Sequence, residues 1–153
     1  MAGLLHDWAW SQRGAADKAE AVERARQAER VLRDCLATRT ITLRPGSSRL
    51  ADTRTRLGGA LVALAVLDST MTAEARQAMF TEAETLLLVA YENTKQPANR
   101  LPSDQTKEIL EFLVRLYEAK GDAAAAAGWK KKLGDLNNAA GAVQDATDAA
   151  KEE

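Results

Sequence analysis

The sequence is poor in the side chains that most often carry chemistry. Cys35 is its only cysteine and His6 its only histidine. One cysteine cannot form an intramolecular disulfide, so a disulfide framework is excluded. One histidine supplies neither a histidine-paired metal site nor acid–base chemistry that needs two imidazoles. We therefore expect no bound metal, no cofactor and no catalytic site, and the protein is not expected to be an enzyme.

Two further features are missing: an excess of positive charge and a long apolar run. The formal net charge is −1, whereas a protein that contacts phosphates is normally basic, so nucleic acid is not an expected partner. The run LVALAVL (61–67) is far shorter than the ~20 residues that span a bilayer. The N-terminus has no basic lead and meets Asp7 early, so no signal peptide is predicted. These absences favour a cytoplasmic protein that does not insert into membranes.

Alanine and leucine, in contrast, are abundant. Apolar residues make up 46% of the 153 residues, which is enough to form the core of one domain. Aromatic residues make up only 5%, there are three prolines, and β-branched runs are few. This composition predicts an all-α protein. The apolar spacing places helices over residues 17–39, 50–67, 73–91, 104–120 and 123–133.

Short polar residues mark where these helices begin, because their side chains can accept hydrogen bonds from the free N–H groups of a first turn. The expected N-caps are Ser48, Thr72, Ser103 or Asp104, and Asp122. The polar, alanine-rich residues 136–153 are predicted to be either a frayed helix or disordered. The helical domain is therefore expected to comprise residues 1–135.

The stretch GDAAAAAGWKKKL (121–133) could be a basic docking patch or the last turns of a helix. Gly134 follows where a helix commonly ends in glycine. Lys130, Lys131 and Lys132 would then occupy the last turn, facing the negative end of the helix dipole. This favours a helix that ends at Gly134 with a solvated lysine face, and contact with an anion or a partner is the alternative.

Three stretches of the chain resemble one another: AERVLRDCLATR (28–39), AETLLLVAYENT (83–94) and AAGWKKKLGDLN (126–137). They begin 55 and 43 residues apart, which in a helical chain indicates stacked helical hairpins. Each has a small residue first, because two helices approach closely there, and Gly58-Gly59 would serve the same approach from a neighbouring helix. The matching positions are Ala28/Leu32/Cys35, Ala83/Leu87/Ala90 and Ala126/Lys130/Leu133.

On these residues the chain resembles a known family. RLADTRTRLGGAL (49–61), AETLLLVAYENT (83–94) and ILEFLVRLYEAKGDAAAAAGWKKKL (109–133) are similar to tetratricopeptide (TPR) repeats of the long-period, kinesin-light-chain-like type. Such repeats occur near the C-terminus of large bacterial proteins, including serine/threonine kinases. The resemblance covers about residues 28–133. It implies a short α-solenoid of about three antiparallel helix hairpins that binds other proteins. Kinase motifs are absent from the sequence, so kinase activity is not implied.

Two segments depart from that family. VLDSTMTAEARQAM (66–79) replaces what is usually a short turn. LLHDWAWSQ (4–12) is barely three turns long, yet it must serve as the leading helix of the first hairpin. The first hairpin is therefore expected to be incomplete.

The remaining polar residues have ordinary structural explanations. Cys35 lies on an apolar stripe between Leu32 and Leu36, which favours a buried core residue over a reactive thiol. Many carboxylates lie four residues from an arginine, which predicts ion pairs within a helix. The clearest of these pairs are Glu20/Arg24 and Glu29/Arg33.

Trp8 and Trp10 are two residues apart, so one short helix cannot bury both on one face. In one interpretation, one of them packs on the first long helix and the other lies on the surface. In the other, one of them anchors a partner or a second copy of the chain, as tryptophan often does at interfaces.

The resemblance also implies a binding groove, because the leading helices of such repeats line the concave face. Here these helices are residues 49–67 and 104–120. Their acidic balance would favour a basic peptide segment, and a merely solvated helix face is the alternative. The outward positions are predicted to be Asp52, Thr55, Val62, Glu108, Glu111, Arg115 and Glu118.

The expected function is therefore non-catalytic protein–protein interaction, as an adaptor or scaffold. The alternative is a structural subunit whose Trp8/Trp10 end joins a larger assembly or a homo-oligomer. An adaptor would be a monomer with a vacant groove, whereas a subunit would self-associate or be unstable alone.

Overall fold

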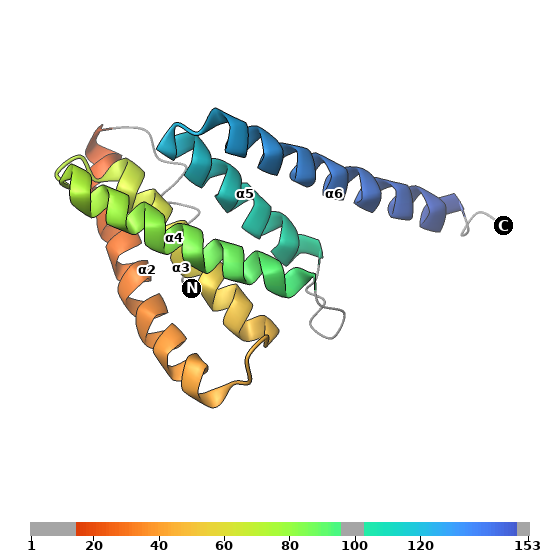
Figure 1. Ribbon diagram of the computed structural model, residues 1–153, viewed down its shortest axis with the longest axis horizontal. Helices are drawn as coiled ribbons and strands as arrows, with labels where there is room; N and C mark the ends of the chain where they lie inside the picture. The colour runs from red at the N-terminus through yellow and green to blue at the C-terminus, as the bar shows by residue number, and fades with distance from the viewer. Residues whose placement is uncertain (1–14, 96–102, 150–153) are drawn as a thin grey trace.

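The computed structural model describes residues 15–95 and 103–149, which form helices and no strand. Neighbouring helices pack against each other in chain order, and α3 also contacts α5 (Figure 1). The prediction of an all-α, solenoid-like stack of helical hairpins is confirmed. The helices are α2 (Ala15–Thr42), α3 (Ser48–Leu67), α4 (Ala73–Thr94), α5 (Ser103–Lys120) and α6 (Ala123–Ala149).

The helix starts follow the capping chemistry closely. The Thr72 hydroxyl accepts from the backbone N–H of Ala75 at 3.2 Å, and the Asp122 carboxylate accepts from that of Ala125 at 3.0 Å. Both predicted caps are confirmed. The prediction for α3 is wrong by one residue, because Ser47 is the N-cap and its side chain makes no capping hydrogen bond.

Glycine ends α5 as predicted. Gly121 has a φ of 76°, the left-handed conformation that glycine adopts without strain. Its N–H donates to the carbonyl of Glu118 at 3.1 Å, and the N–H of Asp122 donates to that of Tyr117 at 2.9 Å. This bond pattern is a Schellman motif, which satisfies carbonyls that the helix leaves free.

Gly134 does not end α6, contrary to the prediction. The helix continues to Ala149, and Gly134 is not among the described glycines with positive φ. One exposed glycine inside a helix costs only about 1 kcal/mol relative to alanine. The alanine-rich residues on both sides favour the helix enough to offset that cost. The helical alternative for the tail is therefore correct as far as Ala149.

The core is centred on α3, where every residue from Leu57 to Ala65 is buried. This helix contacts α2, α4 and α5. A helix that is apolar on all sides is stable in water only when other elements surround it.

The repeat positions meet the core as the spacing predicts. Ala28, Ala83 and Ala126 are all buried. A Cβ placed on Gly58 would lie 2.7 Å from Leu87 Cγ, so α3 and α4 approach closely at a residue that has no side chain. Lys130 is the one repeat position that is exposed.

Segment 66–79 is not an insertion between elements. Only residues 68–72 connect α3 to α4, and the rest of the segment belongs to those two helices. Its extra length therefore extends α4. Across the hairpins, Arg33 of α2 binds Glu82 of α4 through two hydrogen bonds of 2.6 and 2.9 Å. Within the described ranges, no helix has the length and apolarity that crossing a bilayer requires.

Candidate protein-binding surface

The predicted site residues of α5 lie on one stripe of that helix. Glu108, Glu111, Arg115 and Glu118 follow one another at spacings of three and four residues, which places them on the same face. Glu108, Glu111 and Arg115 are half-buried, and Glu118 is exposed. The acidic stripe, as we call these four residues, is therefore accessible along most of α5.

Local contacts hold parts of the acidic stripe in place. The Lys130 ammonium of α6 lies 2.6 Å from the Glu118 carboxylate. The Arg115 guanidinium lies 5.7 Å from the centre of the Phe112 ring, which is a cation–π distance. An exposed ion pair such as Lys130–Glu118 contributes about 0–1 kcal/mol, so a charged ligand could exchange with it.

Two of the three predicted outward positions on α3, Thr55 and Val62, are wrong. Thr55 and Val62 are 2% and 1% exposed, and the Thr55 hydroxyl donates to the carbonyl of Ala51 at 2.9 Å. Asp52 is half-buried and accepts from Arg56 at 2.9 Å. The sequence held a signal against the groove: an unbroken apolar run from Leu57 to Leu67 leaves no polar face. The α3 residues therefore do not join the acidic stripe.

Trp8, Trp10 and His6 lie outside the described residues, so the predictions that concern them stay predictions. Cys35 is half-buried rather than fully buried. Among the described residues, no group of histidine, cysteine and acidic side chains is arranged to hold a metal ion. The predicted pairs Arg24–Glu20 and Arg33–Glu29 are both confirmed.

An aromatic cluster that the sequence analysis missed joins α4, α5 and α6. The Trp129 ring meets Tyr91 edge-on at 5.1 Å between centroids and stacks on Tyr117 at 6.4 Å. The Lys132 ammonium lies 3.8 Å from the Trp129 ring centre. Each of the three aromatic residues is partly buried against the core. Two of the three lysines after Trp129 thus have contacts within the chain: Lys130 forms an ion pair with Glu118, and Lys132 packs on the aromatic cluster.

Beside this cluster, Glu84 accepts hydrogen bonds from Tyr117 Oη at 2.5 Å and from Lys120 Nζ at 2.6 Å. Burial and the bond to Glu84 raise the pKa of Tyr117 to about 12. Burial alone would raise the pKa of Glu84, but the bonds from Lys120 and Tyr117 outweigh it and lower that pKa. These hydrogen bonds therefore link α4 to α5, with the Glu84 carboxylate charged and the Tyr117 phenol neutral.

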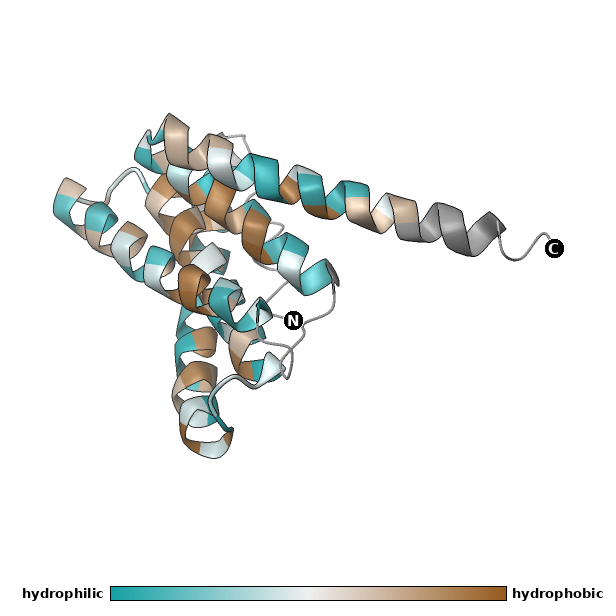
Figure 2. Ribbon diagram, turned by 45° about the vertical axis from the view of Figure 1, so that its right-hand side comes forward, coloured by the Kyte–Doolittle hydropathy of each residue, from teal (hydrophilic) through white to brown (hydrophobic). Residues whose placement is uncertain are grey.

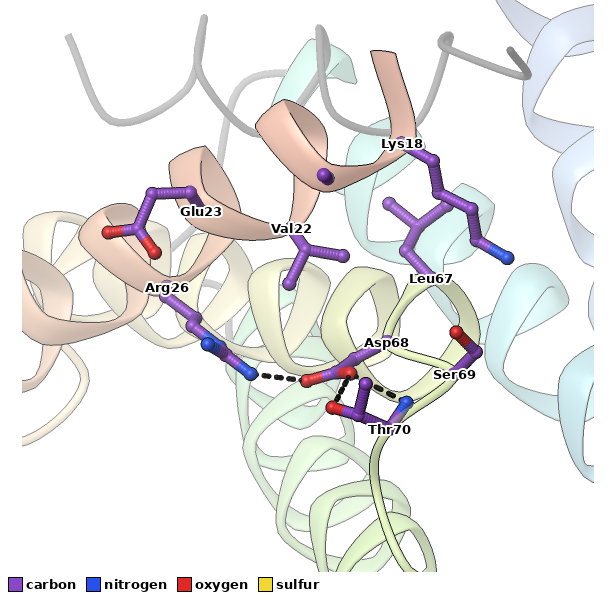
Figure 3. Close-up of a pocket in the computed structure, with 9 residues that line it drawn as sticks. Lys18, Val22, Glu23, Arg26, Leu67, Asp68, Ser69 and Thr70 are labelled. Atoms are coloured by element: carbon purple, nitrogen blue, oxygen red, sulfur yellow. Dashed lines mark hydrogen bonds and ion pairs between the residues drawn. The ribbon is translucent and has the colours of Figure 1, made fainter. Parts of the chain in front are cut away.

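A second polar contact that the sequence analysis missed lies where α3 ends (Figure 3). Asp68 is buried, and its carboxylate accepts from Arg26 Nη2 of α2 at 2.6 Å. It also accepts from the Thr70 hydroxyl at 2.6 Å and from the Thr70 N–H at 3.0 Å. The Thr70 hydroxyl and Arg26 lower the pKa of Asp68, although burial acts in the opposite direction. No spacing rule pairs Arg26 with Asp68, since they are far apart in sequence.

Comparison of the chain with known protein families, with curated proteins and with solved structures finds no match. The resemblance to TPR repeats therefore depends on the quoted sequence motifs alone.

Proposed function

We propose that this protein is a non-catalytic protein-binding module, of the TPR-like kind, that binds a basic peptide segment along α5. The observation that carries the proposal is the acidic stripe, in which three carboxylates share one accessible face of a helix. Its partner side chains would be lysine or arginine at a matching spacing. Because α3 is enclosed, the partner would bind along α5 rather than in a groove between α3 and α5.

The physical basis of this binding is charge complementarity at an accessible surface. Each exposed ion pair contributes about 0.2–1 kcal/mol, so several pairs are needed for measurable affinity. Added salt would weaken them, because the Debye length is about 10 Å at 0.1 M ionic strength. The proposal therefore predicts weak binding with a steep salt dependence.

The test uses a labelled peptide of alternating lysine and alanine, titrated with the whole protein and followed by fluorescence anisotropy. Glu108→Lys combined with Glu111→Lys should weaken binding about tenfold or more, which corresponds to about 1.4 kcal/mol. Asp17→Lys combined with Asp34→Lys is the matched control, because both are exposed acids on α2 and the change in net charge is the same. It should change binding less than twofold. Equal losses in both variants would mean that the peptide responds to net charge and not to the acidic stripe.

A specific observation favours the alternative of a structural subunit or homo-oligomer. The C-terminal part of α6 projects from the other helices (Figures 1 and 2). From Gly134 to Ala142 every residue is exposed except Leu136, which is half-buried. Light scattering of the wild type and of Leu136→Lys, Trp8→Ala and Trp10→Ala separates the two functions. A dimer or larger species that one change converts to a monomer supports the subunit, and a monomer throughout supports the adaptor.

A further inference from the structure

The acidic stripe carries its charges in a fixed order along α5. In chain order its residues are Glu108, Glu111, Arg115 and Glu118. A partner therefore meets negative charge first, then positive charge, then negative charge again. The exposed Asp104 and Lys107 precede the stripe on α5 and carry opposite charges, so they add no net charge to this pattern.

The protein already holds a lysine at one end of the pattern. The Lys130 ammonium of α6 lies 2.6 Å from the Glu118 carboxylate, and the two side chains are 57% and 49% exposed. Beside this ion pair is a hollow of about 470 Å³, lined also by Ala123, Ala126 and Ala127. These small side chains leave room for the aliphatic stem of another long basic side chain. Glu118 can therefore exchange Lys130 for a lysine or arginine of a partner.

We propose that the acidic stripe recognises an extended peptide in which a basic, an acidic and a second basic residue alternate with uncharged ones. One basic side chain binds between Glu108 and Glu111, the acidic one pairs with Arg115, and the other basic one replaces Lys130 on Glu118. This inference rests on the proposed function and specifies its partner. The pattern reads the same in both chain directions, so it holds whichever way the peptide runs.

The spacing of the stripe matches an extended chain. The midpoint of Glu108 and Glu111 lies about 13 Å along the helix axis from Glu118, at 1.5 Å per residue. Four residues of an extended peptide cover about the same distance, at roughly 3.3 Å per residue. Arg115 lies about 8 Å from that midpoint, close to the roughly 7 Å that two extended residues cover. Because residues two and four apart share one side of an extended chain, all three charged side chains can face α5 together.

Arg115 selects against a third basic residue in the middle of the peptide. Its guanidinium lies 5.7 Å from the centre of the Phe112 ring, a contact that limits how far it can move away. A lysine at the middle position would face this guanidinium, and like charges at close range repel each other. A carboxylate at the same position forms an ion pair with it. The specificity therefore comes from repulsion as well as from attraction.

The experiment compares two labelled peptides by fluorescence anisotropy, with the full-length protein at low salt. One contains Lys-Ala-Glu-Ala-Lys and the other contains Lys-Ala-Lys-Ala-Lys. We expect the glutamate peptide to bind about threefold tighter, a change that one exposed ion pair can supply. Attraction by net charge alone predicts the opposite order, because the glutamate peptide is less positive.

Variants assign this preference to Arg115. Arg115→Gln should abolish it, whereas Arg115→Lys keeps the charge and should retain it. Arg44→Gln is the matched control, because Arg44 is exposed on the connection between α2 and α3 and its replacement removes the same charge. It should leave the preference unchanged.

A second pair of variants tests the exchange at Glu118. Lys130→Gln removes the lysine that competes with the peptide, so it should tighten binding of the glutamate peptide about twofold. Lys131→Gln is the control, because Lys131 is exposed beside Lys130 and its replacement removes the same charge. It should change the affinity less.

Three results would overturn the inference. They are equal or tighter binding of the peptide with three lysines, a preference that survives Arg115→Gln, and equal effects of Lys130→Gln and Lys131→Gln. If the peptide with three lysines binds tighter and Glu108→Lys with Glu111→Lys still weakens it, only this inference fails. If neither peptide binds the wild type, the proposed function fails and this inference fails with it.

Discussion

Gly58 of α3 faces Leu87 of α4 at a distance that leaves no room for a side chain. A Cβ on Gly58 would lie 2.7 Å from Leu87 Cγ and 3.0 Å from Leu87 Cδ2. Both residues belong to the buried core. The contact explains why a glycine is present inside a long apolar helix, where it otherwise lowers helix stability.

Replacement of Gly58 should therefore destabilise the fold. We expect Gly58→Ala to lower the free energy of unfolding by about 1–3 kcal/mol, because overpacking in a dense core forces neighbours out of their preferred positions. Urea denaturation followed by circular dichroism measures the change. Gly128→Ala is the control, since a Cβ there meets nothing within 4 Å, and it should be neutral or stabilising. A stable Gly58→Ala variant would mean that Leu87 can move away at little cost.

Gly134 tests the continuity of α6. Gly134 lies inside the helix with open space around it. Alanine favours a helix by up to about 1 kcal/mol relative to glycine. Gly134→Ala should therefore increase the helix content and raise the free energy of unfolding by no more than that amount. A helix that ended at Gly134 in the left-handed conformation would give the opposite sign, because alanine is strained there. Circular dichroism with thermal denaturation distinguishes these results.

Asp68 should make the stability depend on pH in acid. Its pKa is lowered in the folded protein by the Thr70 hydroxyl and by Arg26, so its contribution is present above the unfolded pKa of about 4. That contribution is lost as the pH falls through the lower folded pKa. Asp68→Asn should cost about 1–3 kcal/mol at neutral pH, because it weakens the buried contact with Arg26.

The measurement is the free energy of unfolding of the wild type and of Asp68→Asn between pH 2 and 7. The difference between the two proteins should shrink as the pH falls below about 4. Glu74→Gln is the control, because Glu74 is an exposed acid at the start of α4. A constant difference over the whole pH range would contradict the stabilising role of the Asp68 charge.

Tyr117 should titrate late in base. Burial and the hydrogen bond to Glu84 raise its pKa to about 12, so the folded state favours the neutral phenol. The stability that this provides is complete below the unfolded pKa of about 10 and declines as the pH rises from there toward 12. Ultraviolet titration of the phenol in a Tyr91→Phe background measures the folded pKa.

One variant separates the causes of that pKa shift, and a second measures how much the hydrogen bond contributes to stability. Glu84→Gln should move the Tyr117 pKa toward its ordinary value, because the acceptor loses its charge. Tyr117→Phe should cost about 0.5–1.5 kcal/mol, the usual net contribution of one hydrogen bond. An unchanged Tyr117 pKa in Glu84→Gln would assign the whole shift to burial.

Much of the fold could be predicted from local features. Apolar spacing located the helices, and Thr72, Asp122 and Gly121 marked their ends correctly. These predictions succeeded because capping and turn formation depend on a few neighbouring residues. Gly134 has the same residue type as Gly121, yet it lies inside α6, because the alanine-rich chain that follows it can continue the helix.

The candidate site was predicted only in part. The α5 stripe was located because exposed charges at helical spacing share one face. The α3 residues Thr55 and Val62 were predicted to face outward because the family resemblance implies a concave face there. They are buried, because the apolar run of α3 is surrounded by the other helices. Contacts such as Arg26–Asp68 follow no sequence spacing, since they form only when two distant helices pack.

The sequence by itself determined the helices, most of their ends and the close approach at Gly58. These properties follow from composition and from interactions over a few residues. Only the tertiary structure decided that α3 lies at the centre and that α6 extends past its packed part. Each of these depends on how helices distant in sequence pack together, and no local pattern encodes that arrangement.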